Sequence, residues 1–283
     1  KGCANVPQSY VTVTVIKGTG AANIDGTAFD TRLRQVAEAV SSEIDRYTGR
    51  FIQPRDGTFF YGGDGGTLLL IHDTISLSGG TIVEDDNNDG TFDLNWADDD
   101  FLFLPRNAEP TAEWGRPYTA LMVNPKSNGT QDAFLAGPER YRLIGTFGYV
   151  SILRDPAINA SGSLGTGTAI LVDGTSLEPG QTILIDTERI YIRSVTTGTS
   201  LTVDRGVQNT VVGTHASGTK VQYYDYPAPI KEAAFMQTVR LWQRRNSGFA
   251  SSVGLPETGM FMTFRGLDDD VKLMLNPYRR IRV

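Results

Sequence analysis

The residues that come nearest to a chemical motif are Asp85-Asp86-Asn87-Asn88-Asp89-Gly90. Asp85, Asn87 and Asp89 stand at alternate positions before a glycine, as the first oxygen ligands of a calcium-binding EF-hand loop do. The twelfth position, where that loop needs a bidentate glutamate, is Trp96, and no helix is predicted on either side. A strand–turn–strand connection is therefore the preferred interpretation. A calcium site at Asp85, Asn87 and Asp89 is the alternative, and we expect no other metal.

Side chains that could carry catalysis are few. The two histidines, His72 and His215, have no serine or cysteine motif near them, so we do not expect either to act as a general base. The glycine-rich stretch 162–167 lacks the Lys-Ser/Thr pair of a phosphate-binding loop. The single cysteine, Cys3, can form neither an internal disulfide nor a cysteine-based metal site. We predict that the chain is not an enzyme, with no catalytic residue and no cofactor.

The composition is that of a soluble globular protein, with 283 residues, 40% hydrophobic and 20% charged. No apolar run approaches the length of a membrane span, and the N-terminal residues do not resemble a signal peptide. With so little cysteine, we expect synthesis in the cytoplasm. The formal charge of -6 argues against wrapping nucleic acid on a broad basic surface. The net charge does not exclude a channel that the protein lines and through which DNA passes without being tightly bound.

The sequence predicts two long helices. From Phe29 to Phe51, apolar side chains recur every three or four residues, with Asp25 or Thr27 as possible N-caps and Gly49 at the C-terminal end. From Ile230 to Gly248 apolar residues cover more than one face, which predicts burial inside the domain or between subunits. A shorter helix begins after Asp268 and Pro277 stops it before a basic end.

Short alternating runs separated by Gly-, Asn- and Asp-rich turns predict antiparallel strands over most of the remaining chain. Residues 10–16 are predicted to form a strand or an extended arm, and 155–167 a linker. The predicted class is α+β: a helical base of two long helices plus a C-terminal helix and tail, an antiparallel β domain, and an inserted small β-barrel or sandwich. The expected domains are the arm and long helix (1–56), the β domain (57–157), the insert (163–224) and the C-terminal helices with a docking tail (225–283).

Three segments together resemble the head–tail connector, or adaptor, proteins of long-tailed bacteriophages. They are the helix end SEIDRYTGRFIQP (42–54), the β run from Thr58 to Leu121, and PIKEAAFMQTVRLWQRR (229–245) with the closing Pro277-Tyr278-Arg279-Arg280. Outside 163–224 the resemblance covers most of the chain. That stretch departs from the family's minimal, largely helical pattern. It looks like a small β module of phage structural proteins, with Thr-Val-Asp-Arg-Gly, Thr-His and Gly-Thr-Lys-Val in order.

The resemblance implies a structural protein of the virion neck. Copies would form a ring, typically of twelve, beneath the portal protein and above a stopper or tail-terminator protein. Double-stranded DNA would cross the central channel without sequence-specific binding, and no membrane is involved. By the family's pattern the C-terminal segment docks on the portal, and the expected anchors are Tyr278, Arg279, Arg280 and Ile281. Contacts between subunits are expected at five residues: Phe235, Val239, Trp242, Glu38 and Glu43.

The alternative function is a glycan- or receptor-binding β-rich protein of the virion or cell surface. The aromatic residues Trp96, Trp114, Tyr118 and Tyr149 could then form a platform on which sugars stack. This alternative explains the β-rich body, which contains many threonines and glycines. It does not explain the two helices or the basic tail.

Overall fold

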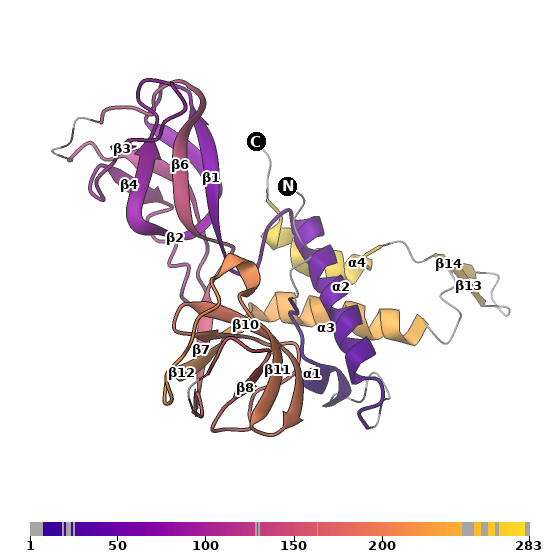
Figure 1. Ribbon diagram of the computed structural model, residues 1–283. Helices are drawn as coiled ribbons and strands as arrows, with labels where there is room; N and C mark the ends of the chain where they lie inside the picture. The colour runs from indigo at the N-terminus through magenta and orange to yellow at the C-terminus, as the bar shows by residue number, and fades with distance from the viewer. Residues whose placement is uncertain are drawn as a thin grey trace. The chain divides into compact units, whose positions relative to one another are not determined.

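The computed structural model describes residues 8–18, 20, 24, 26–127, 129, 131–162, 164–244, 252–255, 260–263 and 266–280. The chain forms two compact units (Figure 1). The first comprises residues 1–50, 154–207 and 211–283, and the second comprises 51–153 with 208–210. Within the described part, no helix is long and apolar enough to cross a membrane.

The second unit is an antiparallel sheet in the order β1-β6-β2-β5-β4, with β3 paired to β2. Its strands are β1 (Arg55–Gly63), β2 (Leu68–Glu84), β3 (Leu94–Asn95), β4 (Phe101–Leu104), β5 (Tyr118–Val123) and β6 (Gly137–Phe147). Strand β2 pairs first with β5 and then with β6, and register shifts mark the change of partner. Because side chains alternate between the two faces, one face encloses a core that includes Trp96, Phe134 and Tyr141.

The first unit contains the other large sheet, in the order β7-β12-β9-β10-β11-β8. Its strands are β7 (Ile152–Asn159), β8 (Ala169–Leu171), β9 (Thr182–Ile185), β10 (Glu188–Thr197), β11 (Ser200–Asp204) and β12 (Lys220–Asp225). We call it the small barrel. The prediction of a linker at 155–167 is wrong, because Ile158, Ala160 and Leu164 are buried in this core. Pro156 is accommodated since β7 ends the strand order, where a missing N–H costs no ladder bond.

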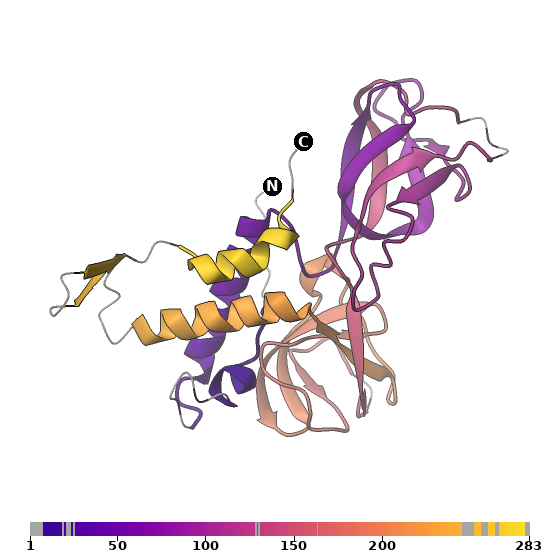
Figure 2. The same cartoon turned by 180° about the vertical axis from the view of Figure 1, so that it is seen from behind.

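Helices complete the first unit. They are α1 (Val13–Gly18), α2 (Asp30–Thr48), α3 (Ala228–Arg244), α4 (Asp269–Leu275) and the 3-10 turns η1 (Val207–Asn209) and η3 (Asn276–Tyr278); residues 208 and 209 of η1 are counted with the second unit. Strands β13 (Ser252–Leu255) and β14 (Met260–Thr263) pair with each other. Figure 2 shows α4 running beside α3. An ion pair between Arg240 and Asp270 joins the two helices, and the Phe29 ring meets the Trp242 ring edge-on at 5.5 Å, joining α2 to α3.

The predicted α+β class with a helical base is wrong. The fold is mostly β, with 36% strand and 23% helix, and the described residues form no base of two long helices. The physical reason is that each large sheet buries an apolar core of its own, so neither needs a helical platform to cover its inner face. The helices are instead a smaller part of the first unit, beside the small barrel.

Two local predictions near the start of the chain also differ from the structure. The strand or extended arm predicted over residues 10–16 is wrong from Val13 onward, because Val13–Gly18 form α1, in which Val13 and Ile16 lie three apart and are buried on the same helical face. The N-cap position of α2 is Phe29, and no side chain caps it; Asp25 lies outside the described residues. The predicted C-terminal end is confirmed, since Gly49 has φ of 65° and donates its N–H to the Asp45 carbonyl.

Candidate docking site

The end of α2 and the segment after α4 lie against each other, although more than two hundred residues separate them in the sequence. The Arg280 N–H donates to the Thr48 carbonyl at 2.8 Å, and the Tyr47 hydroxyl donates to Asn276 Oδ1 at 2.8 Å. The Arg279 guanidinium lies over the Tyr47 ring, 5.3 Å from its centroid. These contacts hold residues 276–280 on the last turn of α2, where cations also complement the negative end of the helix dipole.

This contact forms a surface hollow of about 870 Å³ with three arginines on its wall. Arg46, Arg279 and Arg280 line it together with Tyr47, and Arg46 is paired with Glu43 on the preceding turn. A guanidinium presents a planar fork of N–H donors that matches a carboxylate or a phosphate. The hollow therefore suits an anionic group carried by a partner, backed by the face of one aromatic ring. We call it the arginine hollow.

Three of the four predicted docking residues are described. Arg279 is exposed, Arg280 and Tyr278 are half-buried, and Ile281 lies outside the described residues. Arg279 and Arg280 both line the arginine hollow, whereas Tyr278 is not among its lining residues. The sequence prediction missed Arg46, Tyr47 and Asn276. Their basic, aromatic and amide types are suitable for a docking site, but nothing in the local sequence connects positions 46–47 with 276.

The predicted contact residues on α3 mostly pack against other parts of the same chain. Val239 and Trp242 are only 7% and 4% exposed, because α1, α2 and α4 surround the helix. Phe235 is half-buried and lines a groove of about 610 Å³ beside the small barrel. Two of the three α3 residues expected to contact a neighbouring subunit, Val239 and Trp242, are thus buried within a single chain.

The two predicted contact residues on α2, Glu38 and Glu43, have partners within the chain as well. Glu38 accepts hydrogen bonds from the Tyr191 hydroxyl at 2.7 Å and from Arg193 at 3.4 Å, both on β10, and pairs with Arg34 on its own helix. Burial and the nearby Glu38 carboxylate raise the pKa of Tyr191. The charged face of α2 therefore contacts the small barrel through Glu38. Glu43 forms an ion pair with Arg46 on the same helix.

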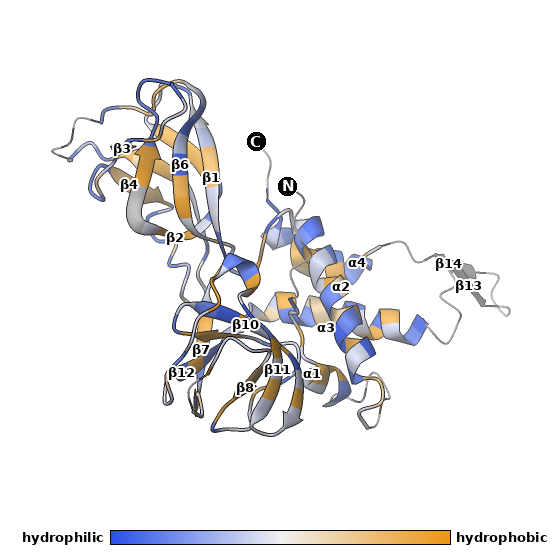
Figure 3. Ribbon diagram, viewed as in Figure 1, coloured by the Kyte–Doolittle hydropathy of each residue, from blue (hydrophilic) through white to orange (hydrophobic). Residues whose placement is uncertain are grey.

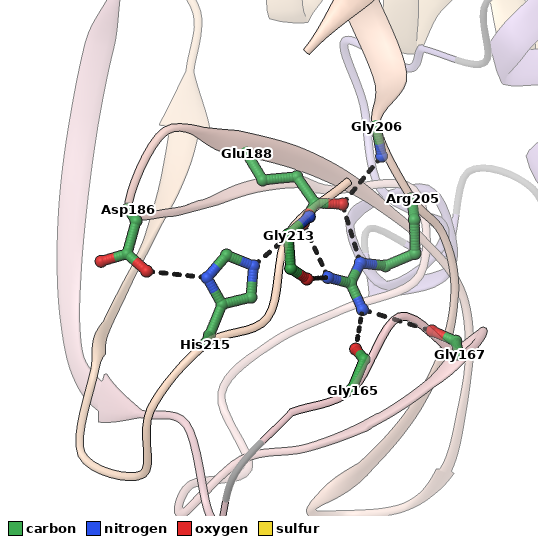
Figure 4. A network of polar contacts seen from close by, with 8 residues as sticks. All are labelled: Gly165, Gly167, Asp186, Glu188, Arg205, Gly206, Gly213 and His215. Atoms are coloured by element: carbon green, nitrogen blue, oxygen red, sulfur yellow. Dashed lines mark hydrogen bonds and ion pairs between the residues drawn. The ribbon is translucent and has the colours of Figure 1, made fainter. Parts of the chain in front are cut away.

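A second polar cluster lies inside the small barrel, and it contains His215 (Figure 4). Glu188 is at the centre: Arg205 donates to its carboxylate through Nε at 2.8 Å and Nη2 at 2.6 Å. The backbone N–H groups of Gly206 and Gly213 donate to the same carboxylate, at 2.9 and 3.0 Å. Glu188 and the Arg205 side chain are 1% and 4% exposed. We call this cluster the Glu188 network.

His215 and Arg205 extend the Glu188 network to neighbouring loops. The His215 ring has Nε2 at 2.9 Å from a Glu188 oxygen and Nδ1 at 2.7 Å from an Asp186 oxygen. Arg205 also donates to three backbone carbonyls, those of Gly165, Gly167 and Gly213. These bonds tie neighbouring loops together, which gives the Asp-Arg-Gly and Thr-His motifs a structural role in the barrel.

The pKa of Glu188 reflects this environment. Burial alone would raise it, but the hydrogen bonds from Arg205, the Gly213 N–H, His215 and the Gly206 N–H outweigh burial and lower the pKa to about 2. The carboxylate is therefore ionised at neutral pH.

The Asp85 loop uses its oxygens on its own backbone. Asp85 accepts from the N–H groups of Asp89 and Gly90 at 3.0 and 2.8 Å, and Asn87 accepts from Asp89 at 3.2 Å. Asp89 accepts from the Thr91 N–H at 2.7 Å, which lowers the pKa of its carboxyl. In the described part of the chain, no group of three or more His, Cys, Asp or Glu is arranged to hold a metal ion.

A search of protein-family models and a search of curated proteins found no match to the chain.

Proposed function

We propose that the chain is a structural connector of a phage virion, in which copies form a ring that joins the portal protein to the tail. The family it resembles typically has twelve copies in this ring. In this proposal the ring sits in the neck, above a stopper or tail-terminator protein, and double-stranded DNA crosses its channel. The proposal rests on the resemblance of three separated segments. It is strengthened by one observation: two of those segments, the end of α2 and residues 277–280, together form the arginine hollow.

The arginine hollow supplies the chemistry that docking needs. Arg279 is exposed, and Arg46 keeps most of its side-chain surface in water, so both can reach a carboxylate on another protein. Backbone and side-chain bonds to Thr48 and Tyr47 fix the segment in advance, so less conformational entropy is lost when a partner binds. We therefore place the portal contact at this hollow, with acidic residues on the portal side.

The proposal is tested with the double substitution Arg279→Glu, Arg280→Glu and purified portal protein of the same virion. We expect binding to weaken at least about tenfold, because two like charges replace two attractive ones at the contact. Binding is measured by biolayer interferometry with the portal immobilised. Point substitutions are preferable to deleting everything after Gly266, since Val271 and Leu275 are fully buried and their loss would uncover α3.

The matched control is Arg32→Glu, which reverses an exposed arginine at the opposite end of α2. It should leave portal binding unchanged. If the double variant binds the portal as wild type does while remaining folded, the hollow is not the docking site.

The alternative of a glycan-binding protein has one observation in its favour, the 95% exposure of Trp114. The predicted aromatic platform does not form, however, because Trp96 is buried and stacks on Phe134 inside the second unit, 4.8 Å between ring centroids. Retention of a sugar on a glycan array, lost in Trp114→Ala, would favour this alternative over the connector.

A further inference from the structure

The sheet of the second unit carries large apolar side chains on its outer face. Because Leu69, Ile71 and Leu121 point into the core, their strand neighbours point outward. The outward set comprises Leu68 and Leu70 of β2, Met122 of β5, and Leu102 and Leu104 of β4. We call these five residues the outer patch.

The strand register makes the outer patch continuous. Leu68 pairs with Met122, which pairs with Leu102, and in the next row Leu70 pairs with Ala120, which pairs with Leu104. Leu68 and Leu70 are 46% and 64% exposed. Figure 3 shows β4, the last strand in the order, as strongly apolar. Adjacent exposed leucines that continue across the face of a sheet to half-buried leucines on its last strand are unusual in a monomer and are typical of a binding surface.

The two units also differ in charge. The second unit contains six Lys and Arg against fifteen Asp and Glu, a formal charge of -9, whereas the rest of the chain contains 20 against 17, or +3. Exposed Asp64, Asp98 and Asp99 precede β2 and β4, at the end of the patch formed by Leu68, Met122 and Leu102. An occupant of the outer patch must therefore bury apolar side chains and tolerate, or favour, a negative surrounding.

We propose that the outer patch binds a second copy of this chain, through the positively charged first unit of that copy. Patch-to-patch pairing would bring two units of charge -9 together, whereas pairing with the first unit brings -9 against +3. Such a contact joins two different surfaces, so every copy keeps one of each free for the next neighbour. Contacts of this kind repeat around a ring. The assignment extends the proposed function but does not depend on the portal as partner.

The first test is the mass of the full chain in solution, measured by sedimentation velocity over a concentration series. Leu70→Asp and, separately, Leu104→Asp should shift wild-type oligomers to monomers, because a carboxylate would be buried without a partner. Far-UV circular dichroism checks that the variants fold. The control is Ile144→Asp, which alters a 41% exposed residue of β6 outside the outer patch and should leave the mass unchanged.

Two outcomes of this test would overturn the proposal: a wild-type chain that stays monomeric up to millimolar concentration, or folded patch variants that keep the wild-type mass. Loss of association in Ile144→Asp as well would also count against the outer patch.

A second test identifies the surface that meets the patch. Raising sodium chloride from about 50 to 500 mM should weaken association, since salt screens attraction between opposite charges. Cross-links between isotopically distinct copies should join the second unit of one to the first unit of the other. Association that strengthens with salt, with cross-links between two second units, would mean that the patch pairs with itself. Neither readout involves the portal, so failure here is distinct from failure of the portal assignment.

Discussion

At the scale of single residues, a few buried polar side chains around Glu188 connect the loops of the small barrel by hydrogen bonds and ion pairs. Glu188 contacts one arginine through two nitrogens, one histidine and two backbone N–H groups, so five nitrogen atoms surround its carboxylate. The sequence shows His215, but it does not show which residues His215 contacts. Its partners lie 27 and 29 residues upstream, and the pairing of β12 with β9 and the bridge between Leu164 and His215 bring the segment before β12 to them.

The network predicts an acid-dependent stability. The pKa of Glu188 is about 2 in the folded chain and near 4.5 when exposed. Its contribution is therefore fully present above pH 4.5 and is lost as the pH falls from 4.5 towards 2. A difference of this size corresponds to roughly 3 kcal/mol of unfolding free energy. Urea titrations at pH 7, 4 and 3 measure it, with Glu188→Gln expected to be less stable at pH 7 and less sensitive to acid.

The control for this prediction is Glu178→Gln, which removes a half-buried carboxylate of the same barrel outside the Glu188 network. It should retain the wild-type pH dependence. An acid response in Glu188→Gln equal to that of the wild type would mean that other carboxylates carry the effect.

At the scale of elements, α2 is where distant parts of the first unit converge. Its middle meets the small barrel through Glu38, and its end meets residues 276–280. The 3.6-residue period predicted this helix and its glycine end well, because both are local properties of the sequence. A different local signal failed at residues 10–16, where alternating β-branched residues favoured a strand or extended arm, but Val13–Gly18 form a helix that buries Val13 and Ile16.

Gly49→Ala tests the role of the helix end. Gly49 has φ of 65°, which an L-residue adopts at a cost, so we expect a loss of about 1 kcal/mol in unfolding free energy. Portal binding should weaken in parallel, because Arg280 is bonded to the carbonyl of the adjacent Thr48. Thermal unfolding and biolayer interferometry measure the two effects.

Gly18→Ala is the matched control, since Gly18 ends α1 with open space around it and no positive φ. It should be neutral or slightly stabilising. Equal stability of the Gly49 and Gly18 variants would show that the left-handed end of α2 is not needed.

At the scale of the whole molecule, the sequence was informative about strands and misleading about class. Alternation and turn residues correctly predicted antiparallel strands over most of the chain outside the helices. The class was wrong because two conspicuous helices suggested a base, whereas the sheets bury their own cores. The arginine hollow and the outer patch could not be predicted, because both depend on packing and strand register between distant segments.

The central claim is that copies of the chain form a ring that docks on the portal. Electron cryo-microscopy of the wild-type chain mixed with purified portal protein tests it most directly. We expect a ring of copies on one face of the portal, joined by contacts at the outer patch, with residues 276–280 against portal carboxylates and an open central channel. Portal particles without the chain, at concentrations where the chain is folded and in excess, would contradict it.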